Sequence, residues 1–219
     1  MRSLRTPRPY CACVLLLSGF CAANGAQNWE AGFGGGGSLY LDRTLTAGNR
    51  TGQVGFDPGF YGSGWLGQDL FRYIGGEIRY SFLWNKMKVE ASGSKITAGA
   101  QAHSFHYDVH FHLAPKSART RPYLLAGGGG KLFRGTGQEN AFQPLSNIAI
   151  LTMTNQWQWM ANFGAGVKWR AGRRTILRVE VRDQFSGFPA DLLFPAPGLK
   201  RPKGGIHNFL FGAGIGYRF

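Results

Sequence analysis

The stretch Phe209-Leu-Phe-Gly-Ala-Gly-Ile-Gly-Tyr-Arg-Phe219 decides the fold of this chain. Its apolar residues recur at every second position up to Phe219, and Gly212, Gly214, Gly216 and Arg218 lie between them. Successive side chains of a strand point to opposite faces of a sheet. The alternation therefore predicts an extended strand with one apolar face and one small or polar face.

The N-terminus has the order of a secretory signal peptide. A basic region with Arg2, Arg5 and Arg8 precedes an apolar run over 11–23, and small residues follow it. This run is too short for a helix that spans a membrane. We expect residues 1–26 to be a signal peptide and 27–219 to form one domain. The cleavage site stays open, because Cys21-Ala-Ala23 and Ala23-Asn-Gly25 both suit a signal peptidase.

Cysteine usage and charge limit the chemistry of the mature chain. All three cysteines lie in the expected signal peptide, so no disulfide, thiolate metal site or cysteine nucleophile is expected after cleavage. The formal net charge is +14, but the basic residues are scattered and no nucleic-acid motif occurs. We therefore expect no nucleic-acid partner. Anionic lipid headgroups or polysaccharide phosphates suit this charge better.

Alternation of apolar and polar residues predicts eight strands. They cover 29–41, 59–68, 73–84, 100–114, 122–133, 157–169, 175–185 and 207–219. Short connections are expected near 69–72, 115–120 and 170–174, and long ones near 42–57, 85–99, 135–155 and 186–206. In lipid every backbone polar group must be paired, and a closed sheet does this. The sequence therefore predicts an all-β fold, an eight-stranded antiparallel up-and-down transmembrane β-barrel.

The polar faces of these strands carry charges that would point into the lumen: Glu77, Arg79, Asp108, Lys168, Arg178, Glu180, Arg182 and Arg218. Unpaired charges in a confined interior are costly, so we expect a structural network of ion pairs. A proton or ion path is the alternative. An eight-stranded barrel is too narrow for an open diffusion pore.

Two further patterns concern aromatic residues and histidines. Trp84, Trp157, Trp159 and Trp169 fall near strand ends on the apolar face, as expected for the aromatic girdles of a membrane barrel. The row His106-x-Asp108-x-His110-x-His112 shares one face, but i and i+2 side chains lie roughly 6.5–7 Å apart along a strand. We expect no metal site and no cofactor, and the sequence leaves metal binding by this histidine row open.

Across the mature chain, the signal sequence, the alternating strands and the terminal Gly-Ile-Gly-Tyr-Arg-Phe219 resemble the small OmpA-like or OmpX-like outer-membrane barrels. The resemblance implies an outer-membrane location with both termini in the periplasm. It also implies that the barrel-assembly machinery reads Phe219, Tyr217 and Ile215 as an assembly signal. The chain ends with the barrel, so the peptidoglycan-binding domain of full-length OmpA proteins is not expected. The partners implied are outer-membrane lipids and lipopolysaccharide-type phosphates, around a monomer.

The function that follows is a structural or surface-interaction role without catalysis. A lipid-modifying enzyme of the outer leaflet, a narrow channel and a soluble ligand-binding barrel are the alternatives. Against the enzyme, the adjacent His103 and Ser104 would point to opposite faces, and no Gly-x-Ser-x-Gly element occurs. A soluble barrel would point Trp157, Phe163, Val179 and Tyr217 inward, whereas a membrane barrel points them outward.

Overall fold

The structure is a computed structural model that describes residues 29–47, 50–137, 143–198 and 204–219. Every regular element within these ranges is a β-strand, and they contain no helix long and apolar enough to cross a membrane. The expected signal peptide, residues 1–26, lies outside the described residues.

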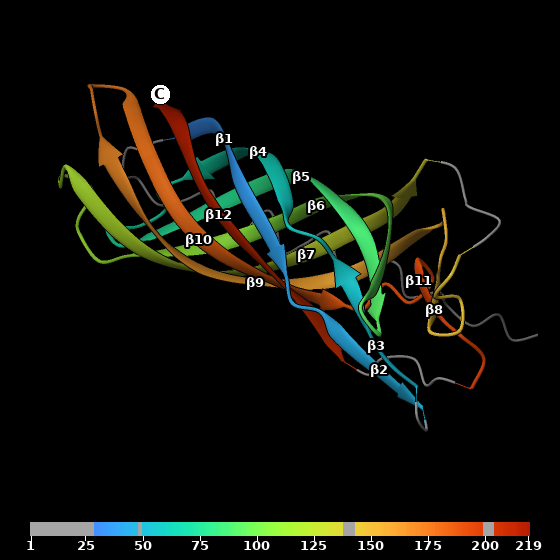
Figure 1. Cartoon of the computed structure of the whole chain (residues 1–219). Helices are drawn as coiled ribbons and strands as arrows, with labels where there is room; N and C mark the ends of the chain where they lie inside the picture. The colour runs from blue at the N-terminus through green and yellow to red at the C-terminus, as the bar shows by residue number, and fades with distance from the viewer. Residues whose placement is uncertain (1–28, 48–49, 138–142, 199–203) are drawn as a thin grey trace, which may run out of the picture.

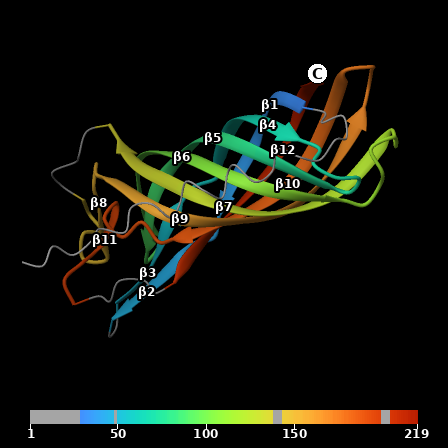
Figure 2. The same cartoon turned by 180° about the vertical axis from the view of Figure 1, so that it is seen from behind.

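Eight of the twelve strands form a closed barrel (Figures 1 and 2). They are β1 (Trp29–Tyr40), β4 (Gly59–Gln68), β5 (Ile74–Ala91), β6 (Ser94–His112), β7 (Thr120–Thr136), β9 (Asn155–Arg170), β10 (Thr175–Gly187) and β12 (Gly205–Arg218). Each pairs antiparallel with the next in this order, and β12 pairs with β1 to close the ring. The predicted eight-stranded antiparallel barrel is confirmed.

Both described chain ends lie at one end of the barrel. Trp29 and Phe219 exchange two backbone hydrogen bonds there, with N···O distances of 3.3 and 3.0 Å. The connections over 69–73, 113–119 and 171–174 turn at this same end, which we call the short-turn end. The opposite, long-loop end carries the remaining elements β2 (Arg43–Ala47), β3 (Arg50–Phe56), β8 (Ala149–Leu151) and β11 (Leu193–Pro195) (Figure 1).

The long loop predicted over residues 85–99 is wrong. β5 and β6 continue through this region and pair from Asn85↔Ala100 to Ala91↔Ser94. A two-residue turn joins them, in which Ser92 and Gly93 both have positive φ, at 51° and 78°. Such turns match the twist of a hairpin and favour glycine. The hairpin therefore projects well beyond the predicted end of the barrel wall.

The polarity of the wall reverses along this hairpin, at Trp84. From Glu77 to Ser81 the inward residues of β5 are polar, while the outward ones are apolar up to Trp84, with Glu77 and Arg79 buried and Tyr80 exposed. Beyond it, Met87 and Val89 are buried, while the charged residues Lys86, Lys88 and Glu90 occupy the outward positions. We call the part with a polar lumen the lower tier and the part with an apolar interior the upper tier. The lower tier suits lipid outside, and the upper tier suits water.

Candidate functional site in the barrel lumen

The structure places seven of the predicted lumen charges inside the barrel, each at most 7% exposed: Glu77, Arg79, Asp108, Lys168, Arg178, Glu180 and Arg182. The eighth, Arg218, is only partly buried at the short-turn end, 3.5 Å from Asp69. Alternation along each strand turns these side chains inward together. The lumen is therefore the one place where many ionisable groups of the described chain meet.

The centre of the network connects two opposite strands, β5 and β10. Glu77 accepts hydrogen bonds from Arg79 Nε at 2.8 Å and Arg178 Nη1 at 2.6 Å. Arg79 Nη1 also donates to Glu180 Oε1 across the lumen at 2.7 Å. Arg182 Nε donates to the same oxygen at 3.0 Å. Charged hydrogen bonds thus cross the barrel in both directions.

Glu30 and Trp65 belong to this network, and the sequence did not reveal them. Lys168 Nζ donates to Glu30 Oε2 at 2.9 Å, and Trp65 Nε1 donates to Glu30 Oε1 at 3.2 Å. The indole also lies against two guanidinium groups, with ring-centroid distances of 4.7 Å for Arg79 and 4.3 Å for Arg178. Extending the β1 alternation backward from Tyr40 would have placed Glu30 inward, but the glycines of β1 hid which alternate residues face the lumen.

The central network is balanced in charge. Its acids are Glu30, Glu77, Asp108 and Glu180, and its bases are Arg79, Lys168, Arg178 and Arg182. Buried charges are tolerated when paired and hydrogen-bonded on all sides. The arrangement is that of a polar filling that ties the strands together.

A smaller ion-pair group lies at the short-turn end. Arg121 Nη1 is 3.0 Å from Asp69 Oδ2, and the more exposed Arg218 approaches the same carboxylate. The cavity above this group, lined in part by His110 and His112, measures only about 10 Å³. That volume admits about one water molecule. The lower tier therefore offers no open path at this point.

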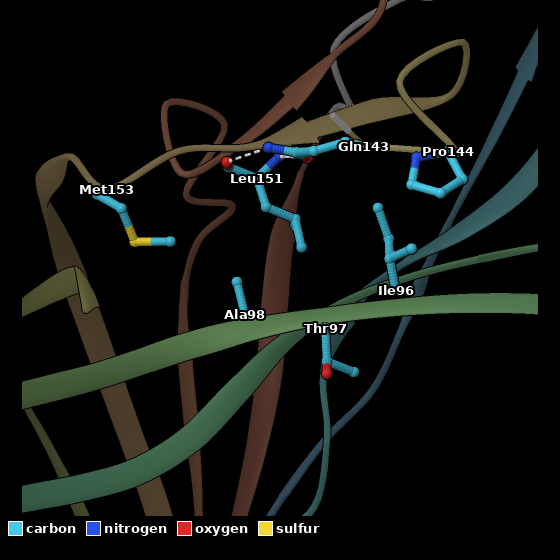
Figure 3. A pocket seen from close by; sticks show the side chains of 7 residues that line it. All are labelled: Ile96, Thr97, Ala98, Gln143, Pro144, Leu151 and Met153. Carbon is cyan, nitrogen blue, oxygen red and sulfur yellow. Dashed lines mark hydrogen bonds between the residues drawn. The ribbon is translucent and has the colours of Figure 1, made fainter. Parts of the chain in front are cut away.

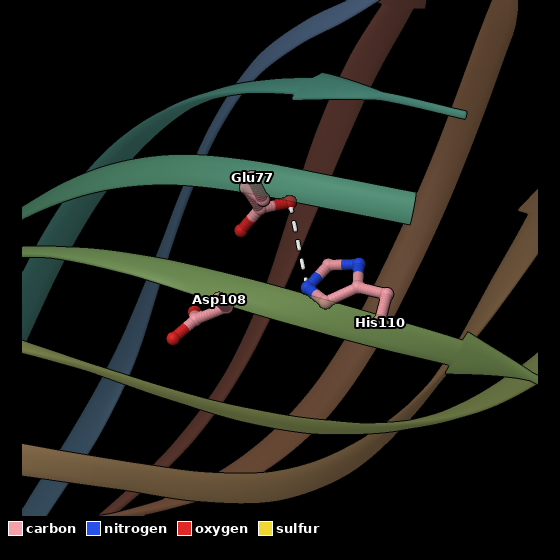
Figure 4. Close-up of side chains that lie close together, drawn as sticks. All are labelled: Glu77, Asp108 and His110. Atoms are coloured by element: carbon pink, nitrogen blue, oxygen red, sulfur yellow. Dashed lines mark ion pairs between the residues drawn. The ribbon is translucent and has the colours of Figure 1, made fainter. Parts of the chain in front are cut away.

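The histidine row brings one candidate metal group together, from Glu77, Asp108 and His110 (Figure 4). Their ligand atoms lie within 4.8 Å of one another, and His110 Nε2 is 3.9 Å from Glu77 Oε2. However, Arg178 already contacts Glu77, and Arg182 contacts Asp108. A metal cation would have to displace these guanidinium groups, so the donor set suits arginine better than metal.

Lys131 lies inside the barrel where the two tiers meet. The side chain is fully buried, and its Nζ donates to Gln184 Oε1 at 3.0 Å. The ammonium also lies 4.9 Å from the ring centroid of Tyr40 and 5.3 Å from that of Phe133. An amide and two aromatic faces thus surround this cation, and the apolar interior begins directly beyond it.

The upper tier is filled by an apolar core and covered by a small sheet of β8 and β11. Leu83, Met87, Phe133 and Ile206 are buried among many others in this core. The loop residues Leu145, Ile148 and Leu192 and the β11 residue Leu193 pack onto it from above. A pocket of about 150 Å³ remains between the core and the covering loops, where Leu151 faces Ile96 and Ala98 (Figure 3). The predicted polar lumen therefore extends only through the lower tier.

The predicted girdle residues all lie on the outside of the barrel. Trp157 and Trp159 are 66% and 87% exposed on the long-loop side of β9, and Trp169 is exposed at its short-turn end. Trp84 is exposed on β5, where the polarity of the wall reverses. The predicted assembly residues Ile215, Tyr217 and Phe219 are likewise exposed along β12. Two aromatic levels therefore border one apolar outer surface.

Known structures share this architecture. The outer membrane protein OprG of Pseudomonas aeruginosa matches with a TM-score of 0.61 and 12% sequence identity, over 89% of this chain and 96% of that one. The Neisserial surface protein A (NspA) matches with a TM-score of 0.49 and 10% identity, over 88% and 97%. No protein-family model matches the sequence, and no curated protein matches it.

The chain has the fold of the small outer-membrane β-barrels. This is the fold expected from the OmpA-like and OmpX-like resemblance. Trp157, Phe163, Val179 and Tyr217 all point outward and are between 49% and 66% exposed. A soluble ligand-binding barrel would have pointed them inward, so that alternative does not fit the described barrel.

Proposed function

We propose that this protein is an integral outer-membrane barrel whose upper tier forms a rigid platform outside the cell for surface interactions. The short-turn end and both termini lie in the periplasm in this proposal. The lumen has a structural role and no catalytic one. The barrel-assembly machinery reads the exposed side chains of Phe219, Tyr217 and Ile215, and the folded protein is a monomer.

The observation that carries the proposal is the reversal of polarity on β5 at Trp84. Up to Ser81, β5 has the polar inside and apolar outside that suit lipid, and the outside stays apolar as far as Trp84. Above it, the same strand has an apolar inside and a charged outside, as water-exposed sheets do. A barrel that stays in one solvent has no physical reason to reverse its faces. The reversal supports a membrane boundary at Trp84, with seven further β5 residues, 85–91, beyond it.

The outer rim of the upper tier supports an anionic partner. Lys86, Lys95 and Arg134 are exposed there. Lys95 Nζ is 2.7 Å from Asp57 Oδ1, and this hydrogen bond holds the pKa of the ammonium above its ordinary value. Positive charge next to an outer leaflet attracts lipopolysaccharide-type phosphates. Such lipids are the partners we propose for the rim, rather than nucleic acid.

Location and orientation can be tested together, because the described residues contain no cysteine. Two single variants, Lys95→Cys and Arg173→Cys, place one thiol at each end of the barrel. We expect outer-membrane fractionation, a heat-modifiable band on gels, and labelling of intact cells by a membrane-impermeant maleimide only for Lys95→Cys. Labelling of Arg173→Cys alone would reverse the orientation. A soluble protein without a heat shift would disprove the membrane proposal.

A further inference from the structure

A histidine–carboxylate pair lies on the outer surface of the barrel, away from the lumen. His207 on β12 and Asp183 on β10 project outward from neighbouring strands, and His207 Nδ1 lies 2.7 Å from Asp183 Oδ2. The His207 ring also lies 4.8 Å from Phe185 and 6.2 Å from Phe209, measured between ring centroids. The pair is therefore held in one orientation by a hydrogen bond and two aromatic rings.

The surroundings of this pair are apolar. Its outward neighbours include Leu41, Phe163, Val181 and Phe185, each at least 38% exposed, and the partly exposed Phe209. The ladder of β10 and β12 ends at Gly187↔Gly205, two residues beyond Phe185↔His207. At the rise of a strand this is roughly 7 Å. In the proposed orientation, these apolar neighbours place the pair against the acyl chains of the outer leaflet.

Ionisable side chains that face lipid are costly, and they commonly mark a functional site. Oδ1 of Asp183 is buried and has no hydrogen-bond partner among the described residues, which adds to this cost. The pairing with Asp183 occupies Nδ1 of His207, and Nε2 receives no hydrogen bond from the described part of the chain. With a proton on Nδ1, Nε2 is an acceptor that can take a hydrogen bond from a hydroxyl group.

The barrel contains a second lipid-side histidine that serves as a comparison. His103 Nδ1 lies 2.8 Å from the Tyr80 hydroxyl, and its ring lies against Phe82. Its other ring nitrogen, Nε2, is buried. His103 is thus a lipid-side histidine whose free nitrogen is covered, whereas Nε2 of His207 is not among the buried unpaired atoms.

We propose that the Asp183–His207 pair binds the hydroxyl group of a hydroxyacyl lipid chain in the outer leaflet. The hydroxyl donates to His207 Nε2, Asp183 holds the ring in the accepting orientation, and Phe185 and Phe209 pack against the chain. The inference rests on the proposed outer-membrane location.

Native mass spectrometry of the purified protein tests this with two phosphatidylglycerols. One carries 3-hydroxytetradecanoyl chains, and the other carries plain tetradecanoyl chains. A net hydrogen bond of about 1 kcal/mol corresponds to roughly fivefold preferential retention of the hydroxylated lipid. We expect this preference in the wild type and in the control His103→Phe, and equal retention of both lipids in His207→Phe.

Three results would overturn the inference while leaving the outer-membrane proposal intact. They are no chain preference in a folded, heat-modifiable wild type, the same preference in His207→Phe, and a dimer that only His207→Phe abolishes. The last result would assign the pair to contact between two copies of the chain. A protein that is soluble and shows no heat shift would overturn both proposals.

Discussion

At the scale of single residues, Glu77 is the hub of the lumen. Its carboxylate contacts three guanidinium groups, those of Arg79, Arg178 and Arg182, and is fully buried. A buried ion pair adds little net stability compared with an apolar pair of the same volume. Loss of one partner is different, because the charges left behind can no longer reach water.

Replacing Glu77 with glutamine should therefore destabilise the barrel by about 3–5 kcal/mol, because the shape is kept and the charge is lost. Urea unfolding in lipid vesicles measures this change. Glu90→Gln is the matched control, since Glu90 is exposed on the outer face of the same strand. We expect the control to change stability by less than about 0.5 kcal/mol. Equal effects of the two variants would show that the network does not hold the barrel together.

Gly214 of β12 makes room for the inward Trp65. A methyl group at Gly214 would lie 2.5 Å from Trp65 Cη2 and 2.9 Å from the carbonyl oxygen of Phe33. Gly64, on the outer face of β4, has no atom closer than 3.8 Å to the same position. We expect Gly214→Ala to destabilise the barrel by about 1–3 kcal/mol through overpacking. Gly64→Ala should be neutral or slightly stabilising in the same unfolding assay, and a similar loss in both would point to glycine flexibility instead.

At the scale of elements, the eight barrel strands could be predicted because period-two alternation survives wherever a strand has an apolar outer face and a polar or small inner face. All eight predicted strands correspond to barrel strands, including the glycine-rich β1 and the weakly patterned β4. The upper part of β5 was missed for a physical reason. Met87 and Val89 alternate with lysines there, but the polarity is opposite to that of the lower tier, so the segment resembled a polar loop.

The small sheet of β8 and β11 could not have been predicted. Each strand has three residues, and each depends on a partner more than 40 residues away in sequence. The inward orientation of Glu30 and Trp65 was not predicted for a related reason. The glycine-rich strands β1 and β4 show only weakly which of their residues face inward. What the sequence did indicate was the class of residue that faces inward, and not which partners those residues would find.

The β8–β11 sheet should behave as a local unit that opens without the barrel. Leu193 is fully buried beneath it, whereas the adjacent Phe194 is 40% exposed. We expect Leu193→Asp to expose the covering loops to protease while the heat-modifiable barrel band persists, because local units differ in stability. Limited proteolysis of intact cells measures this. Phe194→Asp is the control, and loss of the heat shift in Leu193→Asp would contradict an independent barrel.

The terminal residue of β12 should matter for assembly more than for the folded state. Phe219 is 61% exposed, so its ring contributes little packing energy inside the barrel. We expect Phe219→Ala to reduce the amount of folded protein in the outer membrane several-fold without changing its unfolding midpoint. Phe60→Ala is the control, because Phe60 is an outward phenylalanine, 73% exposed, on β4. An equal loss of folded protein in the control would assign the effect to lipid contact.

At the scale of the whole molecule, the two tiers close the barrel in series. The lower tier is filled by paired charges around Trp65, and the upper tier by apolar side chains such as Leu83, Phe133 and Leu210. The interior of an eight-stranded barrel is just wide enough for side chains to fill. The two fillings use different interactions and different residues, so damage to one does not open the other.

We therefore expect the protein to show no ion conductance in planar lipid bilayers, and we expect the same of the double variant Trp65→Ala, Arg178→Ala. That variant removes the indole and one guanidinium from the lower tier, but ions would still meet the apolar upper tier, where a charge loses its water. Stable current steps from the double variant alone would show that the lower tier is the only barrier. Current steps from the wild type would favour a narrow channel over a closed platform. Conductance measurements therefore distinguish a barrel closed by two independent fillings from a narrow channel.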